Sequence, residues 1–216
     1  MNPRPLPCQG SALPLSYAPK LRRIKLLYLK EFDPDCQYCG KKGIILASPG
    51  ERTPGVIGLL SDSHDNLVMI RRAISLFNDA GCDLVVHAGD FVAPFAAEEL
   101  RNLRCPVRAV FGNCDGERAG LARTFQGLGE IRDAPFAFAH GGLRFVVTHL
   151  DGPVAGYLAS IPCDVLVFGH THSPFLEWRG GVLVVNPGEA GGWLRGRATA
   201  ALLDPAARAA EILDLA

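Results

Sequence analysis

The chain has 216 residues, of which 48% are hydrophobic and 20% are charged, and its 22 Lys or Arg balance 22 Asp or Glu. This length suits one domain with an appendage, and the sequence contains no run of 18 or more apolar residues that would predict a membrane span. Seven cysteines at scattered spacings, and no apolar leader segment in the first 30 residues, predict a reduced, cytoplasmic protein.

The two parts of the chain differ in charge and composition. Residues 1–55 carry nine Lys or Arg and four Asp or Glu and are rich in proline, whereas the remainder carries 13 and 18. Cys36 and Cys39 form only half of a zinc-ribbon pattern. We therefore expect residues 1–55 to be a flexible or non-native N-terminal extension and residues 56–216 to form the domain. An acidic domain gives no support for binding nucleic acid.

From residue 56 onward, strands and helices alternate. Apolar runs predict strands at 56–61, 83–87 and 107–111. Asn66 is a suitable N-cap for a helix whose apolar face holds Leu67, Ile70, Ile74 and Phe77, and further helices are predicted at 93–103 and 117–125.

The second half of the domain changes to short strands with Gly pairs at the turns. We expect these strands at 136–139, 143–148, 165–168, 175–178, 182–186 and 198–203. Parallel units followed by such strands indicate an α/β fold in which two mixed β-sheets pack together and helices lie outside.

Polar side chains that can bind a metal follow the apolar runs. Seven of them offer oxygen or imidazole ligands: Asp62, His64, Asp90, Asn113, His149, His170 and His172. About three to five such ligands suit one ion, whereas seven, with a carboxylate that can bridge, suit two. Taken singly, the Asp residues could be helix caps, the His residues could be packed or solvated, and Asn113 could be a turn residue.

The motifs that contain these residues occur in a characteristic order. They are Asp62-Ser-His64, Gly89-Asp90, Gly112-Asn113, Thr148-His149 and Gly169-His170-Thr-His172, with Asn186-Pro-Gly-Glu189 closing the series. Together they resemble the calcineurin-like metallophosphoesterase superfamily, and within it the small bacterial and archaeal phosphodiesterases of the YfcE and MJ0936 type. The resemblance runs from about residue 56 to the C-terminus.

The resemblance implies a four-layer αββα sandwich and a dinuclear metal site. Asp62, His64 and His172 are expected to bind one divalent ion, Asp90 to bridge, and Asn113, His149 and His170 to bind the other. Mn²⁺ is the expected ion, with Ni²⁺, Zn²⁺ or Fe²⁺ as alternatives, because the ligands mix oxygen with imidazole.

The expected activity is hydrolysis of a small phosphodiester by hydroxide that the metal pair activates. Asp62, Asp90, Asn113 and His149 are the expected catalytic residues, and Asn113 and Asp151 are expected to contact the substrate.

Two positions depart from the family pattern. Cys114 stands where many members have a His that protonates the leaving group, and it is expected to be a neighbour of the site rather than a ligand. Leu150 and Asp151 follow His149 where close relatives have Gly-His, so a second His is missing and Asp151 would repel a dianionic monoester more than a diester. His87 and His140 lie outside the motifs and are expected to be structural.

Three further expectations follow. One alternative function is a metal-binding scaffold of weak activity that resembles the retromer subunit Vps29, and another is a nuclease like the Mre11 group. Apolar strands near the C-terminus could also form a homodimer interface.

Overall fold

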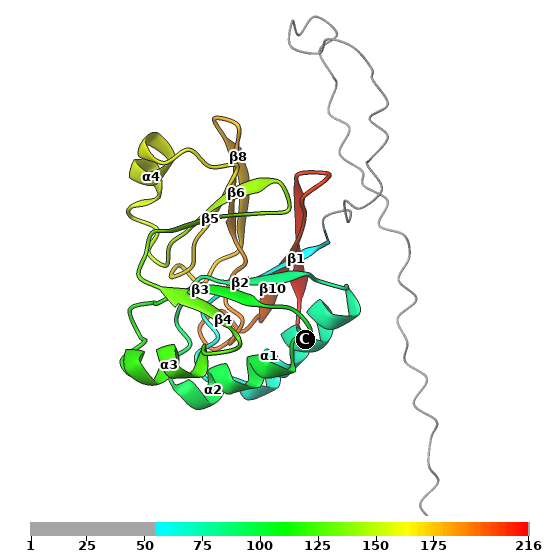
Figure 1. Cartoon of the computed structure of the whole chain (residues 1–216), viewed down its shortest axis with the longest axis vertical. Helices are drawn as coiled ribbons and strands as arrows, with labels where there is room; N and C mark the ends of the chain where they lie inside the picture. The colour runs from blue at the N-terminus through cyan, green and yellow to red at the C-terminus, as the bar shows by residue number, and fades with distance from the viewer. Residues whose placement is uncertain (1–54, 216) are drawn as a thin grey trace, which may run out of the picture. The chain divides into compact units, whose positions relative to one another are not determined.

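A computed structural model of the chain describes residues 55–215 (Figure 1). The expected N-terminal extension, with Cys36 and Cys39, therefore lies outside the described residues apart from Gly55. None of the described helices is long and apolar enough to cross a bilayer.

One sheet has six strands in the order β11-β10-β1-β2-β3-β4. β1 (Ile57–Leu60), β2 (Leu84–His87), β3 (Val107–Val110) and β4 (Gly129–Arg132) are parallel, with Ile57 opposite Leu84 and Val85 opposite Val107. β10 (Thr199–Asp204) pairs antiparallel with β1, and β11 (Ala209–Asp214) pairs antiparallel with β10. The carboxyl ends of β1, β2 and β3 therefore lie side by side.

The other sheet has five strands in the order β5-β6-β7-β9-β8. β6 (Leu143–Val147), β7 (Val165–Val167) and β9 (Val182–Asn186) are parallel, whereas β5 (Phe136–His140) and β8 (Phe175–Arg179) are antiparallel edge strands. Both sheets are thus mixed, as expected from the sequence.

Helices cover the outer face of each sheet (Figure 1). α1 (Leu67–Asp79), α2 (Pro94–Glu98), the 3-10 helix η1 (Glu99–Asn102) and α3 (Arg118–Thr124) lie against the six-stranded sheet, and α4 (Val154–Ser160) lies against the other. Each layer of helices packs on its sheet through a hydrophobic core. A third core lies between the two sheets and includes Leu59 and Val86 from the six-stranded sheet and Phe145 and Val167 from the other. The layers are therefore α, β, β and α, which confirms the predicted fold class.

α1 follows its sequence pattern closely. The Asn66 side chain accepts a hydrogen bond from the Met69 N–H, and Ile70, Ala73, Ile74 and Phe77 are buried on one face. An uncapped N–H at a helix start costs stability, so this hydrogen bond fixes where α1 begins.

The predicted elements differ from the structure in four places. The helix predicted at 93–103 is divided into α2 and η1, and three elements were not predicted: β4, α4 and β11. β11 has partly exposed residues along its length and lies at a sheet edge, so it lacks the buried alternation that marks a strand in sequence.

Candidate metal centre

The seven predicted ligands lie in loops that follow the carboxyl ends of β1, β2, β3, β6 and β7. Five of them have left-handed backbone, with φ between 40° and 67°: Asp62, His64, Asp90, His170 and His172. Residues other than Gly adopt this conformation at a cost, and such strain concentrates at functional sites. The loops therefore hold these side chains in an orientation that an extended strand could not give.

The first group of ligands is formed by Asp62, His64 and His172, which each offer an atom within 4.8 Å of the others. The Asp62 Oδ1 atom lies 3.5 Å from His172 Nε2 and 3.9 Å from His64 Nε2. The two imidazole rings stack with their centroids 5.0 Å apart. The structure thus brings together the three residues expected to bind the first ion.

Asp90 lies between this group and a second one. Its Oδ2 atom is 3.6 Å from His64 Nε2 and 3.4 Å from His149 Nε2. Asp62, Asp90 and His149 also form a group within 4.8 Å. A carboxylate in this position can give an oxygen to each of two neighbouring cations.

His149 has a defined tautomer because its Nδ1 atom is 2.8 Å from the Ala88 carbonyl oxygen, which can only accept. Nδ1 therefore carries the proton, and Nε2 lies 2.8 Å from Asn113 Oδ1 and close to Asp90. The lone pairs of His149 Nε2, Asn113 Oδ1 and Asp90 Oδ2 therefore lie close together, which is unfavourable unless a proton or a cation lies between them. This arrangement suits a metal ion.

Two of the predicted ligands are more exposed than the others. The Asn113 and His170 side chains are exposed, whereas Asp62, Asp90 and His149 are buried. The His170 ring lies 5.3 Å from the His149 ring, and its backbone N–H donates to Asp62. His170 is therefore at the centre but outside the tight ligand groups.

The fit of a cation can be tested on the polar atoms themselves. Within residues 55–215, His64 Nε2 is buried and has no hydrogen-bond partner, although two carboxylates lie within 4 Å. A buried polar atom without a partner is costly, and coordination to a cation would remove that cost. The residues present therefore fit metal binding.

The two carboxylates differ in their electrostatic environment. Burial alone would raise the pKa of Asp90, but the neighbouring His149 and the Cys114 N–H, which donates to Asp90, outweigh burial and hold that pKa well below its usual range. Burial raises the pKa of Asp62, and Ser61 and nearby His side chains only partly offset it. Asp62 therefore depends on additional positive charge to ionise easily.

Asp115 holds together two of the loops that carry the predicted ligands, a role that was not identified from sequence. Its buried carboxylate accepts hydrogen bonds from the N–H groups of Asp90 at 3.1 Å, Val92 at 2.8 Å and Gly112 at 2.7 Å. It therefore joins the loop after β2 to the loop after β3. The sequence analysis assigns no role to Asp115, because the fold brings the Asp90 and Val92 N–H groups to it.

His87, expected to be structural, is fully buried and connects the Asp90 loop to Ser63. Its Nδ1 atom accepts from the Gly89 N–H at 3.1 Å, so Nε2 carries the proton and donates to Ser63 Oγ at 3.2 Å. Burial lowers the pKa of His87 to about 3. It is a neutral positioning residue.

Glu189 supports His172 from the other side. Its buried carboxylate accepts from the N–H groups of Trp193, Leu194 and Arg195 and lies 3.3 Å from His172 Nδ1. Burial opposes ionisation, yet these backbone hydrogen bonds keep the pKa of Glu189 below its usual value. His172 Nδ1 makes no hydrogen bond within residues 55–215, so Glu189 acts on it by placing a negative charge beside the ring. The sequence analysis includes Glu189 only as part of the last family motif and assigns no role to it.

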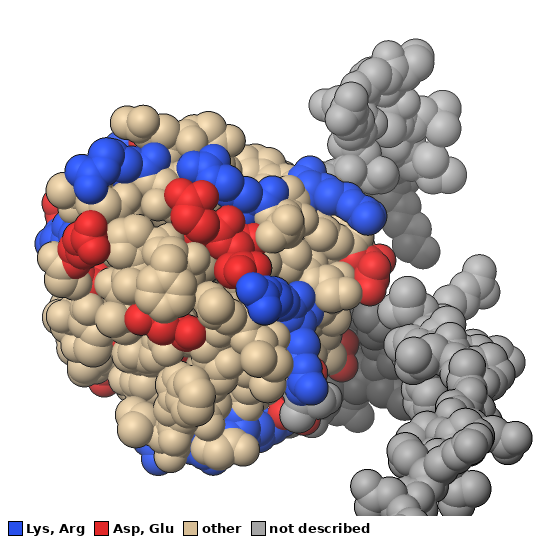
Figure 2. Space-filling view, turned by 90° about the horizontal axis from the view of Figure 1, so that it is seen from below, with Lys and Arg blue, Asp and Glu red and all other residues tan. Residues whose placement is uncertain are grey.

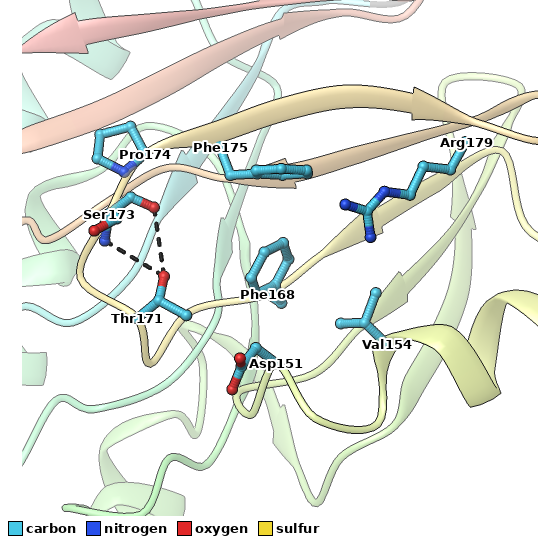
Figure 3. Close-up of a pocket in the computed structure, with 8 residues that line it drawn as sticks. All are labelled: Asp151, Val154, Phe168, Thr171, Ser173, Pro174, Phe175 and Arg179. Carbon is cyan, nitrogen blue, oxygen red and sulfur yellow. Dashed lines mark hydrogen bonds between the residues drawn. The ribbon is translucent and has the colours of Figure 1, made fainter.

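Three other candidates are placed as follows. Cys114 Sγ lies within 4.8 Å of His64 and Asp90 ligand atoms, and burial together with Asp90 raises its pKa to about 11, so it is a thiol. His140 contacts Asp83 at 3.0 Å, at the amino end of β2 and away from the centre. Asp151 lines a hollow of about 280 Å³ with Phe168, Thr171 and Arg179 (Figure 3).

The sequence model of the calcineurin-like phosphoesterase superfamily domain matches residues 56–208. The chain belongs to the calcineurin-like phosphoesterase superfamily. It is 40% identical over 152 residues to phosphodiesterase MJ0936 of Methanocaldococcus jannaschii, covering 68% of this chain and 92% of the relative. It is 31% identical over 150 residues to phosphodiesterase YfcE of Escherichia coli, covering 59% and 75%. These matches confirm the resemblance expected from the motifs.

Solved structures agree with this membership. An archaeal phosphodiesterase superimposes with a TM-score of 0.70 at 36% identity, covering 74% of this chain and 99% of the other. Zinc-complexed Vps29 from Entamoeba histolytica superimposes with a TM-score of 0.53 at 19% identity, over 74% and 99%, which shows a shared fold alone. This member of the superfamily is a phosphoesterase hydrolase that depends on metal.

Proposed function

We propose that this enzyme hydrolyses a small phosphodiester with the help of two divalent ions. The observation that carries the proposal is the place of Asp90, whose carboxylate lies within 3.6 Å of His64 and 3.4 Å of His149, one from each predicted ligand group. The names of the relatives MJ0936 and YfcE support a diester as substrate.

The ligand assignment follows the two groups. Asp62, His64 and His172 would hold one ion, and Asn113, His149 and His170 the other, with Asp90 shared. The chemistry that the ions supply when bound is Lewis acidity and an attacking hydroxide near neutral pH. We propose Mn²⁺ because carboxylate and amide oxygens are combined with imidazole.

The charge balance favours an anionic substrate. Asp62 and Asp90 are the only two acidic residues among the predicted ligands, and the Asn and His ligands are neutral, so two divalent ions would leave the centre with excess positive charge. Asp115 and Glu189 are engaged with backbone N–H groups. A monoanionic diester would be attracted, and Asp151 would repel it less than it would repel a dianionic monoester.

A nuclease is less well supported than a small-molecule enzyme. Beyond residue 55 the chain has 13 Arg, no Lys and 18 Asp or Glu. On the face seen in Figure 2, Arg side chains alternate with acidic ones and form no continuous basic patch. Several Arg residues are paired with acidic ones, as Arg71 is with Glu99 at 2.6 Å. A nucleic-acid backbone is recognised by clustered positive charge.

We also propose that the enzyme works in a reducing compartment. The four described cysteines, Cys82, Cys105, Cys114 and Cys163, are free, which supports a reducing compartment such as the cytoplasm.

The Vps29-like scaffold remains the second candidate function because that fold is shared, although the filled ligand positions favour turnover.

The test is hydrolysis of bis(p-nitrophenyl) phosphate and of p-nitrophenyl phosphate by metal-stripped protein after addition of Mn²⁺, Ni²⁺, Zn²⁺ or Mg²⁺. We expect metal-dependent turnover of the diester, with Mn²⁺ the most effective ion. Asp90→Asn and His64→Ala should each lower kcat/KM by at least about 100-fold, because each removes a ligand.

Matched controls are Asp133→Asn and His140→Ala. The Asp133 side chain is 83% exposed, and the polar partner of the His140 side chain is Asp83, which precedes β2 at the end away from the centre. Both variants should retain activity. Two bound ions per chain with no turnover of either ester would support the scaffold instead.

A further inference from the structure

A second hollow, of about 240 Å³, lies directly beside the candidate metal centre. Two of its lining residues, Asn113 and His149, are predicted ligands, and their side chains contact each other at 2.8 Å. The rest of the wall comes from the loops after β3, β4 and β6 and from α4, and includes Phe111, Leu150, Pro153 and Tyr157. A group in this hollow would therefore be attached to whatever the centre binds.

The wall of this hollow is uncharged. None of its lining residues, all within the described part of the chain, is Asp, Glu, Lys or Arg. The hollow in Figure 3 differs, because Asp151 and Arg179 contribute opposite charges to it. Leu150 and Asp151 are adjacent in sequence, yet they line different hollows. Leu150, one of the two residues that depart from the family pattern, thus adds an apolar side chain to the hollow beside the centre.

Two side chains give this hollow its shape. Leu150 is 43% exposed, so an apolar surface faces solvent at the edge of a polar centre. The Phe111 ring is half-buried, and the Arg118 guanidinium lies 4.1 Å from its centroid, which holds the ring in place. Covering such a surface with an apolar group is favourable in proportion to the area removed from water.

We propose that this hollow binds an uncharged aromatic ester group of the phosphodiester, and that Leu150 and Tyr157 determine the preference for it. The inference rests on the proposed function and adds the substrate class. An apolar cavity of about 150 Å³ can hold benzene, so the hollow has room for one aromatic ring. A charged ester group would lose its hydration without gaining a partner of opposite charge.

The experiment compares two diesters of equal charge, diphenyl phosphate and dimethyl phosphate. Their dissociation constants for the Mn²⁺-loaded full chain are measured by calorimetry. We expect diphenyl phosphate to bind at least about tenfold more tightly. Leu150→Gly and Tyr157→Ala should each reduce that ratio to about twofold while leaving the affinity for dimethyl phosphate unchanged.

Two matched variants serve as controls. Leu176→Gly removes a Leu of nearly equal exposure, 42%, from β8, outside the hollow, and should keep the wild-type ratio. Tyr157→Phe retains the ring and should keep the ratio as well. An unchanged ratio in Leu150→Gly and Tyr157→Ala, or an equal loss of affinity for both diesters, would overturn the inference.

Hydrolysis of bis(p-nitrophenyl) phosphate by the same samples separates this inference from the proposed function. If the enzyme hydrolyses this ester but binds diphenyl phosphate and dimethyl phosphate equally well, only the proposal that the hollow binds an aromatic group is rejected. Absence of turnover with two ions bound would reject the proposed function, whereas the affinity ratio would still report whether the hollow binds a ring.

Discussion

His87 shows how a histidine can serve the centre without binding a metal. Its two ring nitrogens connect the Gly89 N–H to the Ser63 hydroxyl, and its ring stacks on Phe91 with the centroids 3.7 Å apart. The neutral ring makes both contacts, because a protonated ring could no longer accept from Gly89. The loops that carry His64 and Asp90 therefore depend on His87 remaining uncharged.

Protonation of His87 predicts a loss of stability in acid. Its pKa is about 3 in the folded protein and about 6.5 in the unfolded chain, so the unfolded chain binds the proton first as pH falls. Stability is thus complete above pH 6.5 and declines between pH 6.5 and 3. From pH 7 to pH 5 this residue should lower the free energy of unfolding by about 2 kcal/mol.

Urea unfolding of metal-stripped protein at pH 7 and pH 5 measures this loss. His87→Gln keeps one donor and one acceptor but does not titrate, so its loss between the two pH values should be about 2 kcal/mol smaller than that of the wild type. Equal losses would show that His87 does not control the acid response.

The supporting residues were the least predictable part of the centre. The seven proposed ligands could be named from sequence because each follows an apolar run within a short motif. Asp115 accepts hydrogen bonds from the Asp90 and Val92 N–H groups, which only the tertiary fold brings to it, whereas Glu189 accepts from N–H groups of its own loop. A side chain whose partners are backbone groups leaves no complementary residue in the sequence, so its role cannot be identified by pattern.

At the level of elements, β1 and α1 approach each other closely at Gly58. A Cβ atom at this position would lie 2.7 Å from the Phe77 ring, which is itself buried in the core between α1 and the six-stranded sheet. Since neither the strand nor the ring can move freely, a methyl group here would push α1 away from the sheet. This contact also bears on the centre, because β1 leads into Asp62.

Gly58→Ala should therefore lower the free energy of unfolding by about 1–3 kcal/mol, as overpacking a core usually does. Gly156→Ala is the matched control, because Gly156 lies in α4 and a Cβ there meets nothing within 4 Å. The control should be stabilised by up to about 1 kcal/mol through helix propensity. Thermal or urea unfolding of both variants measures the difference, and comparable stabilities would contradict this account of the β1–α1 contact.

The helices and strands that could be predicted from sequence are those that bury apolar residues at regular intervals. α1 and the central strands were predicted because their apolar residues are buried at regular intervals, as in the fully buried β2. β4 is a partly exposed edge strand beginning at Gly129, and α4 buries only Val154 fully. Short elements with little buried surface take their structure from neighbouring elements, and so their sequences carry weak periodicity.

On the scale of the whole molecule, the three cores and the candidate metal centre are formed by residues 56–215. The family match begins at residue 56, and the N–H of Gly55 donates to Asp83 at 2.8 Å. The ligands come from five separate loops, so activity requires both sheets to be in place. We propose that residues 56–216 are the catalytic domain and that residues 1–55 are an extension without a catalytic role.

Removing residues 1–54 tests this proposal directly, because the shortened chain keeps the Gly55–Asp83 contact and every residue of the centre. Its Tm should lie within about 2 °C of that of the full chain, which corresponds to less than about 1 kcal/mol. With Mn²⁺ added, kcat/KM for bis(p-nitrophenyl) phosphate should agree within about twofold. A lower Tm would mean that the removed residues contribute to the fold, whereas an unchanged Tm with lost activity would mean that they contribute to the site.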